Sequence, residues 1–241
     1  MPEAERIGAM STHERPVAPA GSIGWSLVVP VKPAAVGKSR LAPFAGGHRA
    51  DLARAMAIDT ITAALASPRV VELLAITPDP EFADVLARLG AVAVTDEPAA
   101  GLNAALLHGA RLSRSRRPDG AVAAMLADLP ALRPNELTTA LDAASAWPTS
   151  FVPDAAGVGT TLYCAAPGVD FAPRFGGPSR RAHLDAGAVE LTPVPITSVR
   201  RDVDTGADLH QARDLGVGPR TRAALAAMAR RGDPVAETGT S

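Results

Sequence analysis

Cysteine and lysine are scarce in this sequence of 241 residues, and long hydrophobic runs are missing. The single cysteine, Cys164, excludes an internal disulfide, and its apolar surroundings indicate a buried, unreactive thiol rather than a nucleophile. No stretch approaches the roughly 18 apolar residues of a membrane span. These absences argue against a disulfide-stabilised protein, a thiol enzyme and a helical membrane protein.

A strong excess of charge is also absent. The net charge of -1 argues against a general nucleic-acid binder, which usually carries a basic excess. The N-terminal segment 1–23 lacks the apolar centre of a signal peptide, so we interpret it as a disordered leader of a cytoplasmic protein. We therefore expect small-molecule partners and neither nucleic acid nor membrane, and we leave open whether the chain forms a homodimer.

Short β-branched runs alternate with longer segments of helical period, which is typical of a parallel sheet covered by helices. The predicted strands are 25–31, 70–77, 91–95, 121–127, 149–154 and 160–166, with a last extended segment at 191–205. The predicted helices are 48–67, 80–90, 102–113, 133–146, 177–188 and 205–216. We expect an α/β fold with one domain over 24–217, and a C-terminal tail over 218–241 that contains one surface helix.

Both lysines of the chain, Lys32 and Lys38, lie in the segment VPVKPAAVGKSRL, residues 29–41. Gly-Lys-Ser at 37–39 is how a phosphate-binding P-loop ends, but the pattern needs a glycine where Lys32 stands. A P-loop kinase is thus disfavoured. Lysine among so many arginines indicates that a compact ammonium is needed here, although chance on a solvated loop would give the same pattern. We interpret the segment as a basic loop that binds an anion after the first strand.

Aspartates follow two other strand ends, where ligands of open parallel sheets gather. Asp128 ends an apolar run before Leu-Pro, and Asp202 and Asp204 share one side of an extended segment. Carboxylates that converge from strand ends suit Mg²⁺, which prefers oxygen ligands. Alternatively, Asp128 merely stops a strand, and Thr205 with Asp208 caps the last helix; that capping is expected in either case. It leaves Asp202 unexplained.

A third cluster, FGGPSRRAH, spans residues 175–183. Ser179 could N-cap a short helix whose free N–H groups, with Gly176 and Gly177 and the neighbouring arginines 180–181, would hold a phosphate or carboxylate. The GVGTT segment at 157–161 offers hydroxyls and flexible backbone. Ordinary turn and cap roles explain both segments equally well.

Together, the basic loop and the aspartates predict nucleotidyl transfer. Metal on the carboxylates and cations on the loop would neutralise a triphosphate and its departing pyrophosphate. An anionic attacking group needs no general base, and the four histidines expected on helices are interpreted as surface or core residues, namely His48, His108, His183 and His210.

Five segments follow one another along the chain, namely VPVKPAAVGKSRL, ADLPAL around Asp128, GVGTT, FGGPSRRAH and RRDVDT around Asp202 and Asp204. In this order and spacing, they resemble the phosphoenolpyruvate or 2-phospho-L-lactate guanylyltransferases, which make the activated precursor of a deazaflavin coenzyme. The resemblance covers residues 25–217. It implies a single-domain, Rossmann-like nucleotidyltransferase fold of the GT-A type, with a mostly parallel mixed sheet. It also implies a Mg²⁺-dependent reaction with GTP that releases pyrophosphate.

The resemblance also implies site residues. Asp128, Asp202 and, less directly, Asp204 correspond to the metal ligands. Phosphoenolpyruvate contacts would fall on Gly176, Ser179 and Thr161, the last chosen over Thr160 by its spacing to Ser179. The nucleotide-binding residues would be Lys32, Lys38, Ser39, Arg40, Gly101 and Asn103.

Several alternatives remain at this point. The acceptor could be 2-phospho-L-lactate or 3-phosphoglycerate in place of phosphoenolpyruvate. A related enzyme that acts on a sugar phosphate or on a molybdenum cofactor precursor would share the basic loop and the aspartates, but the FGGPSRRAH segment favours a small phospho-acid. A GTP-binding regulator without catalysis would release no pyrophosphate.

Overall fold

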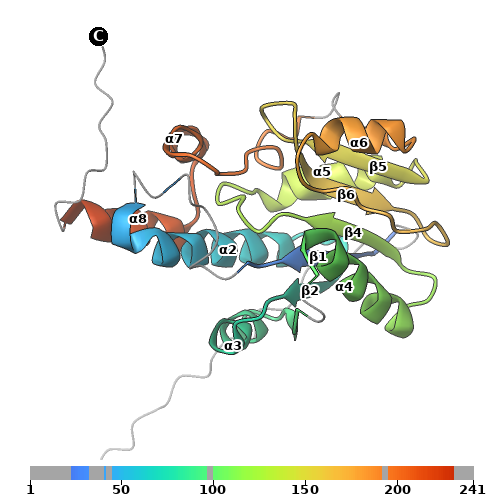
Figure 1. Cartoon of the computed structure of the whole chain (residues 1–241), viewed down its shortest axis with the longest axis horizontal. Helices are drawn as coiled ribbons and strands as arrows, with labels where there is room; N and C mark the ends of the chain where they lie inside the picture. Colours follow the sequence, from blue (N-terminus) through green and yellow to red (C-terminus); the bar gives the residue numbers. More distant parts are fainter. Residues whose placement is uncertain (1–22, 33–40, 42–44, 97–99, 192–194, 231–241) are drawn as a thin grey trace, which may run out of the picture.

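A seven-stranded mixed sheet forms the centre of the computed structural model, which describes residues 23–32, 41, 45–96, 100–191 and 195–230 (Figure 1). The strand order is β3-β2-β1-β4-β6-β5-β7. The strands are β1 (Trp25–Pro30), β2 (Val70–Ile76), β3 (Val92–Val94), β4 (Ala121–Met125), β5 (Thr149–Pro153), β6 (Thr160–Ala165) and β7 (Val189–Glu190).

The first half of the sheet is parallel. Strand β1 pairs with β2 on one side and with β4 on the other, and β3 pairs with β2, all in parallel. The chain order therefore reverses at β1, so the carboxyl ends of β1 and β4 flank the crevice where ligands of such sheets bind. Lys32 follows β1 and Asp128 follows β4, as the sequence predicts.

The second half is mostly antiparallel. Strand β6 runs antiparallel to both β4 and β5, which confirms the predicted hairpin and the mixed sheet. The prediction of an extended segment over 191–205 is wrong for its described part, because the last strand is β7 and residues 197–199 form a turn. Pro195 has no N–H to donate, and the N–H of Ser198 donates to the Glu136 carboxylate at 2.7 Å rather than to a strand.

The helices agree with the predicted positions within a few residues. They are the 3₁₀ helix η2 (Gly46–His48), α2 (Arg49–Leu65), α3 (Pro80–Arg88), α4 (Leu102–Arg116), α5 (Pro134–Ala144), α6 (Ser179–Asp185), α7 (Gly206–Leu215) and α8 (Pro219–Arg230). Helix α4 runs on into the segment predicted as a polar turn, because Ser113 and Arg116 both donate to the Glu72 carboxylate of β2. None of these helices is both long and apolar enough to cross a membrane.

Apolar side chains fill both faces of the sheet. On one face, β1 residues such as Leu27 pack with α2, α3 and α5, and on the other face Val28 packs with α4. Cys164 lies in the first of these layers and is almost fully buried, and this burial raises the pKa of its thiol. The prediction of a buried cysteine is therefore confirmed, and the raised thiol pKa agrees with the expected low reactivity.

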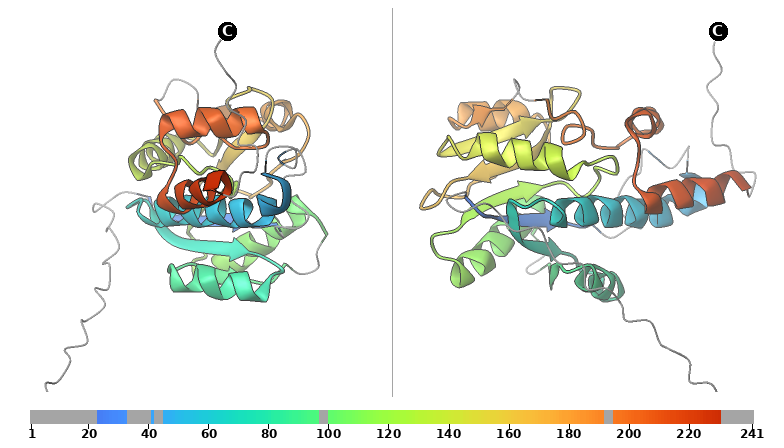
Figure 2. Two further views of the ribbon diagram at one scale, coloured as in Figure 1. Left: turned by 90° about the vertical axis from the view of Figure 1, so that its left-hand side faces the viewer. Right: turned by 180° about the vertical axis from the view of Figure 1, so that it is seen from behind.

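Helix α8 is more firmly attached than the surface helix that the sequence predicts. It packs along α2, as the right-hand view of Figure 2 shows, and it buries Leu225 and Met228. Asp59 of α2 caps its first turn by accepting the backbone N–H groups of Arg220 at 3.1 Å and Thr221 at 2.7 Å. Sequence periodicity missed this attachment because the capping carboxylate lies 161 residues before Arg220.

Candidate active site

A cavity of about 1090 Å³ opens at the carboxyl ends of β1 and β4. Its wall combines the ends of these two strands, one side of α2, the turn between β5 and β6, and the glycine segment before α6. The polar and glycine residues that line it are Lys32, Asp128, Asp154, Gly159, Thr160, Gly176, Gly177, Ser179, Arg201, Asp202, Asp204, Thr205 and Asp208.

The three predicted metal ligands all line this cavity. The N–H of Val203 donates to the backbone carbonyl of Asp128 at 3.1 Å, and this bond joins the segment of Asp202 and Asp204 to the end of β4. Asp202 is half-buried and Asp204 is exposed. Within the part of the chain that the structure describes, no three His, Cys, Asp or Glu side chains form a ready-made metal-binding group.

The capping role expected beside these aspartates is confirmed. Thr205 and Asp208 form a capping box at the start of α7, in which the Asp208 carboxylate accepts the N–H of Thr205 at 2.8 Å. The same carboxylate accepts the N–H of Asp204 at 3.2 Å. Asp208 therefore fixes the backbone that carries Asp204, and Asp202 keeps no part in the cap.

The predicted basic loop is only partly described. Lys32 is exposed and lines the cavity directly after β1. Lys38, Ser39 and Arg40 lie outside the described residues. An ammonium at the end of β1 can reach ligand phosphates that lie over the carboxyl ends of the strands.

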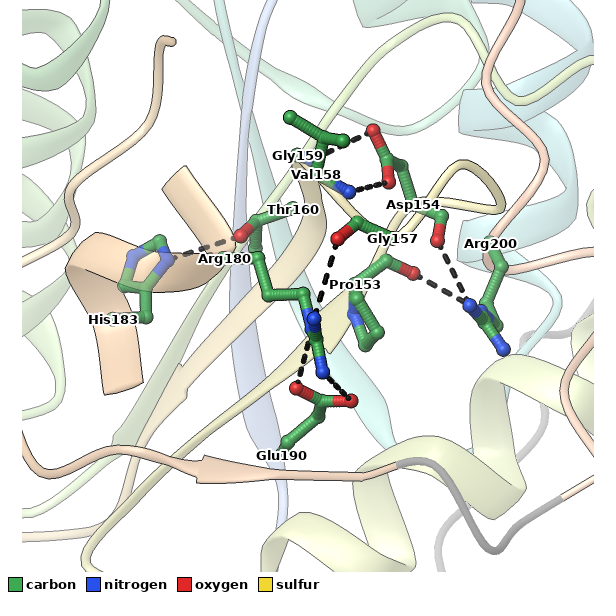
Figure 3. Close-up of polar contacts among 10 residues, drawn as sticks. All are labelled: Pro153, Asp154, Gly157, Val158, Gly159, Thr160, Arg180, His183, Glu190 and Arg200. Atoms are coloured by element: carbon green, nitrogen blue, oxygen red, sulfur yellow. Dashed lines mark hydrogen bonds and ion pairs between the residues drawn. The ribbon is translucent and has the colours of Figure 1, made fainter. Parts of the chain in front are cut away.

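A network of hydrogen bonds fixes the turn between β5 and β6 (Figure 3). The Asp154 carboxylate accepts the N–H groups of Val158 at 2.9 Å and Gly159 at 2.8 Å. The Arg200 guanidinium donates to the carbonyls of Pro153 at 3.2 Å and Asp154 at 2.9 Å. The turn is therefore fastened to the segment that leads into Asp202. Sequence reasoning missed Asp154, although an aspartate before a Gly-x-Gly turn is a known turn signal.

Two arginines of α6 do not face the cavity, contrary to the sequence prediction. Arg180 pairs with Glu190 at 2.7 Å and donates to the carbonyl of Gly157 at 3.4 Å (Figure 3). This pairing raises the pKa of the Arg180 guanidinium. Arg181 pairs with Asp185 within the helix at 2.8 Å. Each guanidinium thus has a carboxylate partner. The Arg181–Asp185 pair is a local i,i+4 pair of the helix, whereas the Arg180–Glu190 pair joins α6 to β7 and depends on the fold.

His183 is a core residue, which confirms its prediction. It is fully buried and stacks against the rings of Phe151 and Tyr163. Burial lowers the pKa of its imidazole to about 4, so the ring is neutral near pH 7. The N–H of Arg174 donates to Nε2 at 2.9 Å, so Nε2 carries no proton and Nδ1 does.

The protonated Nδ1 of His183 donates to the hydroxyl oxygen of Thr160 at 3.0 Å (Figure 3). Thr160 therefore accepts in this bond, and its own hydroxyl proton is not used in it. Thr160 lines the cavity, whereas the predicted Thr161 does not: its side chain is fully buried and donates to the carbonyl of Val152 at 3.4 Å. Successive side chains of a strand alternate between faces, and spacing along the sequence did not identify the correct face.

The glycine segment before α6, Gly176 and Gly177, forms another part of the cavity wall, in addition to the ends of β1 and β4. Gly176 and Gly177 have φ of 102° and 55°, which only glycine adopts readily, and both line the cavity together with Ser179. Ser179 is buried and begins α6, but it does not cap the helix. Pro178 occupies the N-cap position, and α6 has no side-chain cap hydrogen bond there.

Gly101 and Asn103 do not line the cavity. Gly101 precedes α4 with φ of 99°. The Asn103 side chain accepts the N–H of Phe175 and donates to its carbonyl, both at 2.9 Å. Asn103 thus anchors the residue directly before Gly176, rather than presenting its amide to a nucleotide.

The sequence of this chain matches the family model "Guanylyl transferase CofC like" over residues 25–211. The chain belongs to this family. It is 57% identical to the phosphoenolpyruvate guanylyltransferase of Streptomyces avermitilis over 205 residues, which cover 85% of this chain and 95% of that protein. It is 55% identical to the phosphoenolpyruvate guanylyltransferase of Thermomonospora curvata, over 89% of this chain and 93% of that protein.

A solved structure from Desulfovibrio desulfuricans G20, assigned to the nucleotide-diphospho-sugar transferases, has the same fold. It superposes with a TM-score of 0.63 at 17% identity and covers 87% of this chain and 96% of its own. The predicted nucleotidyltransferase fold and the resemblance to guanylyltransferases are both confirmed. The chain is therefore a nucleotidyltransferase of the guanylyl-transferring kind.

Proposed function

We propose that the chain transfers GMP from GTP to phosphoenolpyruvate, forming enolpyruvoyl-2-diphospho-5'-guanosine and pyrophosphate for deazaflavin coenzyme synthesis. One observation carries this proposal. One cavity brings several groups together. They are the carboxylates of Asp128, Asp202 and Asp204, the glycine segment Gly176–Gly177 and the hydroxyl of the buried Thr160. Such a cavity has room for two phosphorylated molecules side by side, with their phosphates over the strand ends.

The reaction needs no proton transfer to begin. An oxygen of the acceptor's phosphate attacks the α-phosphorus of GTP, and the bond from that phosphorus to the oxygen bridging to the β-phosphate breaks. The electron pair leaves with pyrophosphate, and the product joins the acceptor to GMP through a diphosphate. The attacking phosphate is already an anion, which agrees with the absence of a histidine among the described residues that line the cavity.

The residues present fit a magnesium ion. Mg²⁺ is commonly held by one or two carboxylates together with substrate phosphates, so Asp128 and Asp202 suffice and no group of three ligands is needed. Both line the cavity, and the Val203–Asp128 backbone bond holds their segments together. When bound, the ion would neutralise phosphate charge. Asp204 is exposed and would be the weaker ligand.

The two walls support different parts of the reaction. Lys32 at the end of β1 would bind the phosphates of GTP, together with the predicted Lys38, Ser39 and Arg40. Thr160, Gly176 and Ser179 would bind the acceptor, since hydroxyl and backbone donors suit phosphate and carboxylate oxygens. The Thr160 proton, made available by the His183 tautomer, is one such donor.

Phosphoenolpyruvate is the proposed acceptor because both reported relatives, each at least 55% identical, are named for it. 2-Phospho-L-lactate and 3-phosphoglycerate combine the same phosphate and carboxylate, so the polar groups of the wall could recognise them in a similar way. The location of the enzyme in the cytoplasm stays a prediction, and its assembly as a homodimer stays open.

Incubation of the purified protein with GTP, Mg²⁺ and one acceptor at a time tests the proposal. Phosphoenolpyruvate should give the highest kcat/KM for pyrophosphate release, and mass spectrometry should detect the diphosphate-linked product. A higher kcat/KM with 2-phospho-L-lactate or 3-phosphoglycerate would reassign the acceptor. No pyrophosphate release with any acceptor would leave the regulator hypothesis instead.

A further inference from the structure

Arg201 is the one arginine among the described residues that line the cavity. Its Nε atom is buried, and within the described part of the chain it has no hydrogen-bond partner. The neighbouring Arg200 differs, because its guanidinium donates to the carbonyls of Pro153 and Asp154 (Figure 3). The two adjacent arginines therefore differ in role. Arg200 stabilises the β5–β6 turn through its hydrogen bonds, whereas Arg201 lines the cavity.

A buried donor without a partner is costly, and native structures rarely retain one unless a ligand or water satisfies it. The guanidinium is always charged and presents several N–H groups in a planar fork, which matches the oxygens of a phosphate. The cavity position of Arg201 therefore indicates an anionic ligand, which would contact the outer N–H groups of the fork because Nε itself is buried.

Arg201 lies between the two functional regions of the cavity. On one side, the N–H of Ala155 in the β5–β6 turn donates to the Arg200 carbonyl at 2.8 Å. On the other side, the N–H of Val203 donates to the Asp128 carbonyl at 3.1 Å. Arg201 therefore stands where the wall that carries Thr160 meets the carboxylates.

The positive charges of the cavity point to the same role for Arg201. Among the described lining residues the cations are Lys32 and Arg201, and Lys32 follows β1, where the phosphates of GTP are proposed to bind. In the proposed step, the phosphate of the acceptor must approach the α-phosphate of GTP closely, although both groups are anions. A cation beside the acceptor wall would offset this repulsion, and Arg201 has that position.

We propose that Arg201 binds the phosphate group of the acceptor and holds it for attack on the α-phosphorus of GTP. The role of Arg201 rests on the proposed function, and it adds a residue that binds the acceptor in that reaction. The Arg201 fork neutralises the attacking phosphate, and Thr160 donates its hydroxyl proton to the same molecule. No bond to Arg201 forms or breaks.

The test compares steady-state kinetics of Arg201→Gln and Arg201→Lys with those of the wild type. Loss of charge-assisted hydrogen bonds should raise KM for phosphoenolpyruvate, or lower kcat/KM for it, about tenfold to a hundredfold in Arg201→Gln. Arg201→Lys should give a smaller loss, because it keeps the charge but not the planar fork. KM for GTP should change less than twofold.

Two further variants separate binding from a structural role. Arg213→Gln on the exposed side of α7 is the matched control, and it should keep wild-type kinetics and stability. Arg200→Gln should lower Tm, since it breaks two hydrogen bonds of the turn, whereas Arg201→Gln should keep the wild-type Tm. Phosphoenolpyruvate should raise the Tm of the wild type in the presence of Mg²⁺, and this increase should be lost in Arg201→Gln.

Unchanged acceptor kinetics and an unchanged Tm increase in Arg201→Gln would overturn the proposal. A raised KM for GTP with a normal KM for the acceptor would also overturn it, and would place Arg201 on the nucleotide. Failure of the proposed function is distinguishable, because the wild type itself would then release no pyrophosphate with any acceptor.

Discussion

The parallel half of the sheet and the antiparallel half build their sides of the cavity differently. In β3-β2-β1-β4 the wall consists of strand ends, and Lys32 and Asp128 follow the buried strands β1 and β4 within a few residues. In β6-β5-β7 the wall consists of a turn and a glycine segment that side-chain hydrogen bonds hold. Asp154 bonds within the turn, and Arg200 and Asn103 bond to the wall from other segments of the chain.

This difference has a consequence for mutation. A residue at a strand end is positioned by a buried strand, so its replacement removes one functional group and little else. A residue of the second wall is positioned by a polar network, so a change outside the cavity shifts the groups inside it. Variants of the two halves should therefore separate in kinetics and in stability.

The largest effect is expected for Asp128→Asn in the parallel half. The substitution keeps the shape but removes the negative charge proposed to hold Mg²⁺, and kcat should fall by about a hundredfold to a thousandfold. Pyrophosphate release measures the loss, and Tm should stay within the experimental error. Asp214→Asn, on the exposed side of α7, is the control. A kcat near that of the wild type would refute the assignment of Asp128.

The antiparallel half should lose stability in mild acid through His183. The pKa of its imidazole is about 4 in the folded protein and about 6.5 when unfolded, so only the unfolded chain gains this proton between those values. The stabilising contribution is full above pH 6.5 and decreases as the pH falls towards 4, by about 3 kcal/mol in total. Urea denaturation at pH 7.5 and pH 5 measures about 2 kcal/mol of this decrease, because pH 5 lies above the folded-state pKa.

His183→Asn is the matched variant for this pH dependence. The variant has no group that titrates in this range at position 183, so its free energy of unfolding should depend less on pH than that of the wild type. Equal pH dependence in both proteins would show that another group is responsible.

Asn103→Ala tests whether the glycine segment depends on its anchor. It removes two hydrogen bonds to the Phe175 backbone and should lower the free energy of unfolding by about 2 kcal/mol. KM for the acceptor should rise and KM for GTP should not, because Asn103 lies off the cavity wall. The reverse pattern would restore the sequence-based prediction that Asn103 binds the nucleotide.

The smallest effect is expected for Lys32→Ala at the end of β1. Loss of one exposed cation should raise KM for GTP about tenfold and leave both Tm and KM for the acceptor unchanged. Lys32→Arg should recover most of the affinity. A change in acceptor KM alone would contradict the division of the cavity between its two walls.

Sequence patterns predicted the parallel half closely. Buried strands appear as continuous apolar runs, and the polar residue after each run marks the strand end, as for Lys32 and Asp128. The capping box of Thr205 and Asp208 is equally local. The family resemblance then identified guanylyl transfer, which no single segment could have indicated.

The part of the cavity wall that the β5–β6 turn and the glycine segment form could not be predicted in the same way. Thr160 and Thr161 are neighbours in one strand, and only the packed sheet decides which of them faces the cavity. For Arg180 and Arg181 the sequence left both an anion site and an ordinary helix role open, and the structure pairs Arg180 with Glu190 and Arg181 with Asp185. The position of α8 depends on Asp59, far away in the sequence.

Hydrophobic periodicity and strand-end residues act locally, so most of the order of helices and strands, the parallel half of the sheet and the chemistry of the strand ends could be predicted from the residues alone. Which of two adjacent side chains reaches the cavity became clear only in the folded chain, for Thr160 and Thr161 and again for Arg200 and Arg201. That choice depends on hydrogen-bond partners that folding brings together from distant segments, and the order of residues does not record it.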